Sequence, residues 1–277
     1  MQTSVQRLIA TFEQAFQKLG VSVSAKKLED LAITIHRAMT VQARHFHNLE
    51  HVFNFLNPDN PIQSLAALYH DIVYYQVDMG FSPAIWGSIA PYIHIESDAI
   101  YIVEDPPEDD DLLDLSLEVF NFRPGQKLSI VGELNEFFSA LVMCKQLEGL
   151  VCEKDLVKMT LCIEATIPFR GRDANGESHF DVLERRLRQI SQRRNLSFTE
   201  AEIENAIVLA VIFANKDIES FGETDPRIFI ENTWKLLPEM NVALRASNAY
   251  SVRHYRIALE KMEIFLTNLN PANIFNQ

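Results

Sequence analysis

The sequence is poor in the features that mark secreted, membrane-spanning and nucleic-acid-binding proteins. Its 277 residues include only three cysteines, without CxxC spacing, and an odd thiol does not suit a disulfide framework. No run approaches the roughly 18 apolar residues of a membrane span, and the amphipathic start lacks the apolar core of a signal peptide. The net charge of −13 offers no basic surface for a polynucleotide backbone. We therefore expect a cytoplasmic protein that binds neither a membrane nor polymeric nucleic acid.

Hydrophobic residues make up 47% of the chain, which is enough for a large packed core. They recur at helical spacing through most of the sequence, and Thr199 and Glu202 have the spacing of a capping box that starts a helix. Neither an internal repeat nor a change in composition divides the chain. These patterns predict an all-α protein with one helical domain over residues 1–277. The expected helices lie near residues 5–19, 28–39, 46–56, 62–75, 130–148, 153–166, 179–194, 199–218, 226–237 and 250–268.

Residues 76–127 are the exception, because no period dominates there. The run AIYIV at 99–103 fits either a short strand or a piece of helix. The acidic run EDPPEDDD at 104–111 lacks the spacing of an EF-hand calcium loop, so we expect a solvated loop. We expect this segment to shape either a pocket entrance or an interface.

Histidines and carboxylates occupy segments that otherwise have the composition of core. In RHFHNLEHVFNFL, His47 and His51 are four residues apart, so on a helix they share one face. In LAALYHDIVYY, His70 and Asp71 lie in an expected helix that is apolar nearly all round. Asp217 follows Ala214 by three on the buried stripe of a later helix. Each of these residues has an ordinary structural explanation alone, such as a hydrogen-bonded core histidine, but together they need a common one.

Charge supplies that common explanation. Burying Asp71 or Asp217 without a partner costs several kcal/mol or more, and at the C-terminal end of a helix the dipole disfavours a negative charge by about 0.3–1 kcal/mol. A divalent cation would compensate both carboxylates. Two imidazoles and two carboxylates suit Zn, Mn, Fe or Co. The sequence thus favours a buried metal site.

Three short segments resemble the HD superfamily of metal-dependent phosphohydrolases: FHNLEHV at 46–52, LYHDIVY at 68–74 and ANKDIESF at 214–221. Members of that superfamily are helical bundles with an H…HD…D set of metal ligands. The resemblance spans residues 44–221 and implies an HD-type bundle with one or two divalent ions, without distinguishing Zn, Mn, Fe, Mg, Co and Ni. It implies a catalytic role for Asp71 and, as metal ligands, His51, His70, Asp71 and Asp217.

The first segment is also similar to the YHNxxHA motif of cyclic-nucleotide phosphodiesterases. There the first histidine protonates the leaving group, which implies that His47 is a general acid. The phosphodiesterases carry a further histidine where this sequence has Tyr74. The sequence is therefore more similar to small bacterial HD proteins with an HDxVY motif.

A phosphorylated substrate also requires positive charge near the metal. Arg44 precedes His47 by three residues, and Arg170 and Arg172 lie in the expected loop PFRGRDANGES, which could fold over the site. We predict that these three arginines bind the substrate. The arginine-rich helix near 179–194 is instead expected to be a solvated surface.

The resemblance implies a metal-dependent phosphohydrolase that cleaves a phosphomonoester or phosphodiester of a nucleotide or another small molecule with metal-activated water. Two alternatives stay open. A di-iron oxygenase of the HD fold would need further ligands, for which only His94 and His179 lie between His70 and Asp217. A non-catalytic ligand-binding protein could retain the metal site without turnover. The sequence leaves the substrate, the metal and the oligomeric state open.

Overall fold

The computed structural model describes residues 2–130, 132–167, 170–172, 176–245 and 251–268. Helices make up 65% of the protein and strands 4%, so the predicted all-α class is confirmed. Within the described residues, every helix is too short or too polar to span a bilayer.

The helices fall along the chain in three groups. The first group precedes the small sheet and contains α1 (Ser4–Lys18), α2 (Ala25–Met39), α3 (Leu49–Phe55), α4 (Pro61–Tyr69), α5 (Tyr75–Asp78) and α6 (Pro83–Ile89). The second contains α7 (Asp111–Phe120), α8 (Leu134–Leu147), α9 (Glu153–Ala165), α10 (His179–Arg193) and α11 (Glu200–Asp217). The last contains α12 (Pro226–Trp234), α13 (Leu237–Met240), α14 (Val242–Arg245) and α15 (Val252–Asn268). Most long helices agree with the predicted ranges to within a few residues.

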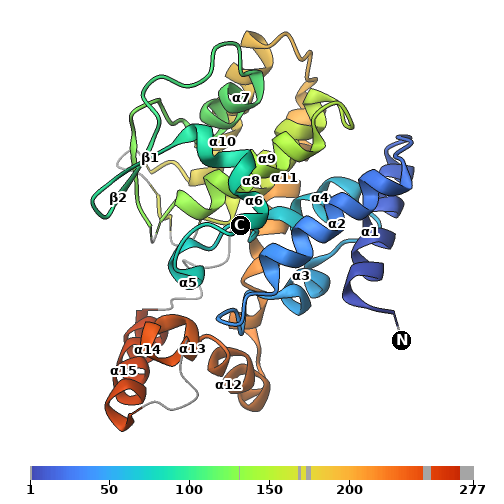
Figure 1. Ribbon diagram of the computed structural model, residues 1–277. Helices are drawn as coiled ribbons and strands as arrows, with labels where there is room; N and C mark the ends of the chain where they lie inside the picture. The colour runs from blue at the N-terminus through green and yellow to red at the C-terminus, as the bar shows by residue number, and fades with distance from the viewer. Residues whose placement is uncertain (1, 131, 168–169, 173–175, 246–250, 269–277) are drawn as a thin grey trace.

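Helix α9 lies at the centre of the main body, where it packs against α4, α7, α8 and α11 (Figure 1). Its side chains are buried nearly all round, as in Leu156, Met159 and Cys162, which is typical of a helix enclosed by others. Burying each large apolar side chain contributes about 1.5–3 kcal/mol. Helix α11 starts at the predicted capping box, in which Thr199 Oγ1 accepts from the backbone N–H of Glu202 at 3.2 Å.

The segment of uncertain periodicity forms a small antiparallel sheet, β1–β2–β3, with β1 at Ile93–Glu96, β2 at Ala99–Ile102 and β3 at Lys127–Leu128. The run AIYIV is therefore a strand. Its side chains alternate in burial, with Ile100 and Ile102 inside. The acidic run is largely exposed as predicted, except that Asp110 caps α7 and pairs with Lys145.

Two helices next to the predicted site are shorter than their periodicity indicates. Helix α3 begins at Leu49 because Asn48 is its N-cap and accepts from the N–H groups of Glu50 (2.8 Å) and His51 (3.3 Å). The prediction that His47 lies on this helix is therefore wrong, since residues 45–48 form bends.

Helix α4 ends at Tyr69 and does not continue to residue 75, so Asp71 lies in a turn. Side chains of α8 replace the helical acceptors. The N–H of Val73 donates to Ser139 Oγ at 3.1 Å, and the N–H of Tyr75 donates to Asn135 Oδ1 at 2.9 Å. These bonds satisfy backbone groups that a helix would otherwise satisfy internally.

Residues 226–245 and 251–268 form a C-terminal lobe, drawn in brown to red in Figure 1, beside the main body. The lobe has a small hydrophobic cluster of its own: Leu236, Leu237, Leu244, Ala258 and Met262. Phe46 and Phe221, from outside the lobe, pack against that cluster. These contacts place the lobe next to the chain around residues 44–48.

A buried carboxylate in α9 fixes α10 and the segment around residue 170. Glu164 is 1% exposed, and an imidazole and two guanidinium groups contact its carboxylate: His179 at 2.7 Å, Arg170 at 2.8 Å and Arg186 at 3.2 Å. Burial alone would raise the pKa of Glu164, but Arg170 and His179 outweigh burial and lower it to about 2. The carboxylate is therefore ionised in the folded protein.

We expect Glu164→Gln to lower the free energy of unfolding at pH 7 by about 3–5 kcal/mol, because it leaves buried cations without their counter-charge. Since the pKa is lower in the folded than in the unfolded chain, the carboxylate stabilises fully above its ordinary value of 4.5, and this contribution is lost as the pH falls toward 2. Urea denaturation of wild type and Glu164→Gln should show that the difference between their free energies of unfolding becomes smaller as the pH falls from 7 to 2.5.

Glu200→Gln is the matched control, because Glu200 pairs with Arg188 on the surface. Its free energy of unfolding should stay within about 1 kcal/mol of wild type. An equally small change for Glu164→Gln would contradict the structural role of this carboxylate.

Candidate metal centre

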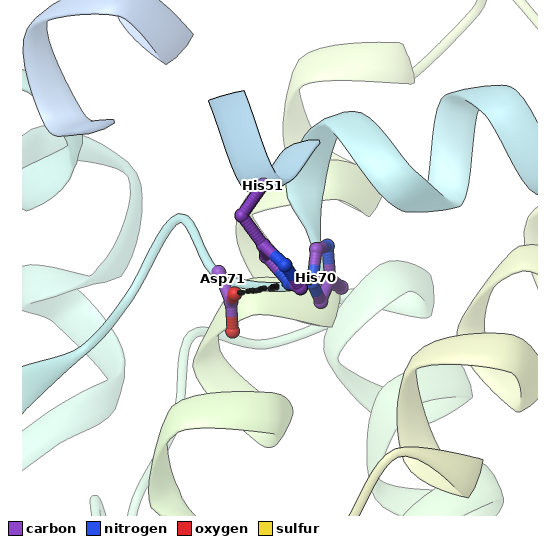
Figure 2. Close-up of side chains that lie close together, drawn as sticks. All are labelled: His51, His70 and Asp71. Atoms are coloured by element: carbon purple, nitrogen blue, oxygen red, sulfur yellow. Dashed lines mark hydrogen bonds and ion pairs between the residues drawn. The ribbon is translucent and has the colours of Figure 1, made fainter. Parts of the chain in front are cut away.

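The four predicted ligands come together from three parts of the chain. His51 lies in the first turn of α3, His70 and Asp71 lie directly after the last residue of α4, and Asp217 is the last residue of α11. Figure 2 shows the side chains of His51, His70 and Asp71 directed toward one another. These three could hold a metal ion, because their ligand atoms all lie within 4.8 Å of one another.

The distances within the cluster are those of atoms that share one ion. The two Nε2 atoms of His51 and His70 are 3.2 Å apart, and Asp71 Oδ2 lies 3.0 Å from His70 Nε2. Asp217 Oδ1 lies 3.1 Å from His51 Nε2 and 3.4 Å from His70 Nε2. Ligands at about 2.0–2.2 Å from one metal ion are themselves about 3–3.6 Å apart. Asp217 thus lies next to both imidazoles, but it is outside the set of three residues whose ligand atoms all lie within 4.8 Å of one another.

The hydrogen bonds around the cluster leave His70 Nε2 and Asp71 Oδ2 available to bind a metal ion. His70 Nδ1 is 2.8 Å from the carbonyl oxygen of Ala67, so Nδ1 donates there and Nε2 is the ring nitrogen that faces the cluster. Asp71 Oδ2 is buried and has no hydrogen-bond partner, although it lies close to His70 Nε2. A buried carboxylate oxygen without a donor is costly, and a cation would satisfy it.

The protein electrostatics also favour positive charge at this position. Burial lowers the pKa of His70, but the carboxylates of Asp71 and Asp217 outweigh burial and raise it to about 10. Burial likewise raises the pKa of Asp217, yet hydrogen bonds from His51 and His70 lower it to about 2. Both carboxylates are thus ionised and attract either protons on the histidines or a metal ion.

His47 lies beside the cluster and is held by a residue of the C-terminal lobe. Its Nδ1 is 2.6 Å from Glu239 Oε2, and its ring centroid is 5.7 Å from that of His51. The other oxygen, Glu239 Oε1, accepts from the backbone N–H groups of His45, Phe46 and His47 at 2.8, 2.7 and 3.2 Å. Burial lowers the pKa of His47, but Glu239, Asp71 and Asp217 together outweigh burial and leave the pKa above its ordinary value.

Arg44 has a structural role in place of the predicted contact with substrate. Its buried guanidinium donates to the Asp78 carboxylate at 2.6 and 2.9 Å and to the carbonyl oxygens of Asp71 and Ile72. The remaining N–H contacts Met39 Sδ. All five N–H groups are therefore in use, and none is left for a phosphate. Arg44 instead fixes the turn that carries Asp71.

The other two predicted substrate-binding arginines lie in the loop after α9. Arg170 binds Glu164 through its two terminal nitrogens, whereas its Nε is buried without a partner. Arg172 is exposed and donates to the carbonyl oxygen of Gly176 at 2.7 Å. Residues 168–169 and 173–175 of the predicted loop lie outside the described residues, and contact of either arginine with a substrate stays a prediction.

The ligands that a di-iron site would need are elsewhere. His94 is an exposed residue of β1, and His179 binds Glu164 at 2.7 Å. Neither belongs to the cluster of His51, His70 and Asp71 among the residues that the structure describes.

Two residues near the cluster were missed by the sequence analysis, Glu239 and Glu136. Each is a lone carboxylate in a largely apolar run, LLPEM for Glu239 and LNEFF for Glu136. The same anomaly identified Asp71, so it was the available signal. Burial, together with the charges of Asp71 and Asp217, raises the pKa of Glu136 to about 8.

Comparisons with models of protein families, with curated proteins and with solved structures find no match. The site is therefore interpreted from its own geometry.

We expect the wild-type protein, stripped with a chelator and reloaded, to bind a divalent ion that raises its stability by about 2.7 kcal/mol at a hundredfold excess over Kd. Asp71→Asn keeps the side-chain shape but weakens the ligand, so ion content and thermal shift should both fall sharply. Elemental analysis and thermal denaturation with Zn²⁺, Mn²⁺, Co²⁺ and Fe²⁺ measure both quantities.

His94→Ala is the matched control, since it removes an imidazole outside the cluster and should leave metal content unchanged. Equal metal content in wild type and Asp71→Asn would show that the cluster is not a metal site.

Proposed function

We propose that the protein is a metal-dependent phosphohydrolase that cleaves a phosphate ester of a small molecule. One observation carries this proposal: His51, His70 and Asp71 could hold one metal ion, Asp217 contacts both imidazoles, and a separate imidazole, His47, lies beside them in contact with a buried carboxylate. A site built only to hold a metal has no need of that third imidazole. The resemblance to HD phosphohydrolases supports the same reaction.

The chain's own residues would hold a divalent ion through His51 Nε2, His70 Nε2 and the two aspartates. When bound, such an ion lowers the pKa of a water molecule and polarises a phosphoryl oxygen. The bond from His70 Nδ1 to the Ala67 carbonyl fixes one imidazole in the tautomer that ligation requires.

His47 is suited to donate a proton to the leaving oxygen of an ester. Nδ1 donates to Glu239 Oε2 at 2.6 Å, so Nε2 is the nitrogen that can serve the substrate. Nε2 has no hydrogen-bond partner among the described residues. The Glu239 carboxylate stabilises the protonated ring and fixes its orientation, which is what a general acid needs.

Aromatic side chains enclose these groups and limit their contact with water. The ring of Tyr74 lies 4.5 Å from that of His47, Phe46 lies 5.3 Å from His51, and Phe55 lies 4.6 Å from His70. Electrostatic interactions are stronger in such surroundings than in water. These aromatic rings therefore strengthen the electrostatic interaction between the charged groups of the site and a bound phosphate.

The proposal is tested by assaying the metal-loaded protein against a panel of phosphomonoesters and phosphodiesters, with release of phosphate or alcohol as the readout. We expect turnover that depends on the added ion and is lost in Asp71→Asn. Saturable binding of phosphorylated compounds without turnover would instead identify a binding protein.

We expect His47→Ala to lower kcat by about 10²–10⁴, the usual contribution of a positioned acid, while metal content stays at the wild-type level. The loss should be smallest for esters whose alcohol is a good leaving group, because these need little protonation. Loss of metal from His47→Ala would remove this residue from the acid role.

Glu239→Gln provides a companion measurement. It keeps an oxygen for the backbone N–H groups but removes the charge that stabilises the protonated imidazole. Its kcat should therefore fall between those of wild type and His47→Ala, again without loss of metal.

A further inference from the structure

A hollow of about 530 Å³ lies where the C-terminal lobe meets the bend before α3. Side chains of α12, Pro238 near the start of α13 and His45 in the bend line it. Small-molecule sites in proteins usually measure roughly 300–1,000 Å³, so the hollow has room for one small organic molecule. None of the candidate metal ligands lines it, and neither does His47. The hollow is therefore separate from the candidate metal centre.

Two large apolar side chains of α12 remain exposed in this hollow. Trp234 is 51% exposed and Ile230 is 56% exposed. They are four residues apart, so they share one face of the helix. The ring of Tyr255 in α15 lies 6.1 Å from that of Trp234 and restricts movement of the indole. Exposed apolar side chains that gather in a concave place mark an interaction site.

Two positive charges border this apolar surface. Arg227 and Lys235 both line the hollow, and among the residues that the structure describes neither side chain has a hydrogen bond or an ion pair. By contrast, Arg194 binds two carboxylates. Glu231 is the one carboxylate among the lining residues, so cations outnumber carboxylates here although the whole chain has a net charge of −13.

The apolar and the charged surfaces together define the ligand. An inorganic anion would pair with Arg227 and Lys235 but leave the Trp234 indole in water. An uncharged hydrocarbon would leave both cations without a partner. Aromatic rings stack favourably on tryptophan, and guanidinium groups bind carboxylates and phosphates through parallel hydrogen bonds. We propose that the hollow binds an organic anion that carries a planar aromatic ring.

The hollow borders the bend that carries His47. The N–H groups of His45 and His47 both donate to Glu239 Oε1, at 2.8 and 3.2 Å, and Pro238 directly precedes Glu239. A ligand in the hollow thus contacts residues next to the contact between His47 and Glu239, outside the set of candidate metal ligands. Binding there is independent of the proposed phosphohydrolase function and is measurable without turnover.

The first test titrates the metal-loaded, isotope-labelled protein with naphthoate, an aromatic carboxylate that contains no phosphate ester. The chain has two tryptophans, whose indole N–H signals are separate in a proton–nitrogen correlation spectrum and are assigned with Trp86→Phe. Naphthoate should shift the Trp234 signal in a saturable way. Trp86 is 42% exposed and lies outside the hollow, so its signal should stay in place. An unchanged Trp234 signal, or equal shifts of both signals, would overturn the proposal.

The second test removes the two charges. Arg227→Gln combined with Lys235→Gln should weaken naphthoate binding by about tenfold or more, the usual loss for hydrogen bonds to a charged group. Both residues are exposed, so the fold should tolerate the change. Arg256→Gln is the matched control, because Arg256 is an exposed arginine of α15 outside the hollow, and its affinity should equal that of wild type. Wild-type affinity in the double variant would refute the role of the cations.

The third test separates the ring from the charge by comparing three compounds on the wild-type protein. Naphthoate should bind more tightly than uncharged naphthamide, and inorganic phosphate should leave the Trp234 signal unchanged at the concentrations at which naphthoate shifts it. Equal affinity for naphthoate and naphthamide would show that the hollow selects no anion. A Trp234 shift of equal size with phosphate would show that it selects no ring. Either outcome would overturn the proposed ligand class.

Discussion

Two carboxylates brought together inside a largely apolar body are the constraint around which this protein is arranged. Asp71 and Asp217 come from different helices, and each is costly to bury without positive charge. Two imidazoles lie within 3.0–3.5 Å of their oxygens, and His51, His70 and Asp71 could hold a metal ion. The chain departs from regular helix in the bend before His51 and in the turn that carries Asp71, next to these side chains.

The structure holds the irregular segments with buried charges. Glu239 accepts the three N–H groups of the bend before α3, Arg44 binds the carbonyl oxygens of the turn after α4, and Glu164 binds Arg170 in the loop after α9. Within a helix the backbone N–H and C=O groups bond to one another, whereas in a bend they need hydrogen-bond partners from elsewhere in the protein. Glu239 and Arg44 thus position backbone segments next to the candidate site, whereas Glu164 holds the loop that carries Arg170.

The sequence predicted the helices well where periodicity alone determines them, as in α1, α9 and α11, and its buried carboxylates led to a cluster of side chains that the structure brings together. It did not predict where α3 begins, because the side chain of Asn48 caps that helix at Leu49. It did not predict where α4 ends, because side chains of α8 accept the backbone N–H groups that a longer helix would have bonded internally. Arg44 was misassigned because its partner Asp78 is 34 residues away. The contact between His47 and Glu239 spans 192 residues, and no local pattern reveals such a pair. Whether the ligand set belongs to an HD-type fold stays a prediction.

The contact between His47 and Glu239 has a consequence for folding during synthesis of the chain. Domains form during synthesis from the N-terminal side, at about 5–20 residues per second. All the candidate metal ligands have been synthesised before the ribosome reaches the C-terminal lobe. The nascent protein can therefore assemble its ligand cluster while the neighbouring imidazole still lacks its anchor. The contact that we propose to orient His47 then forms last, when the final helices dock.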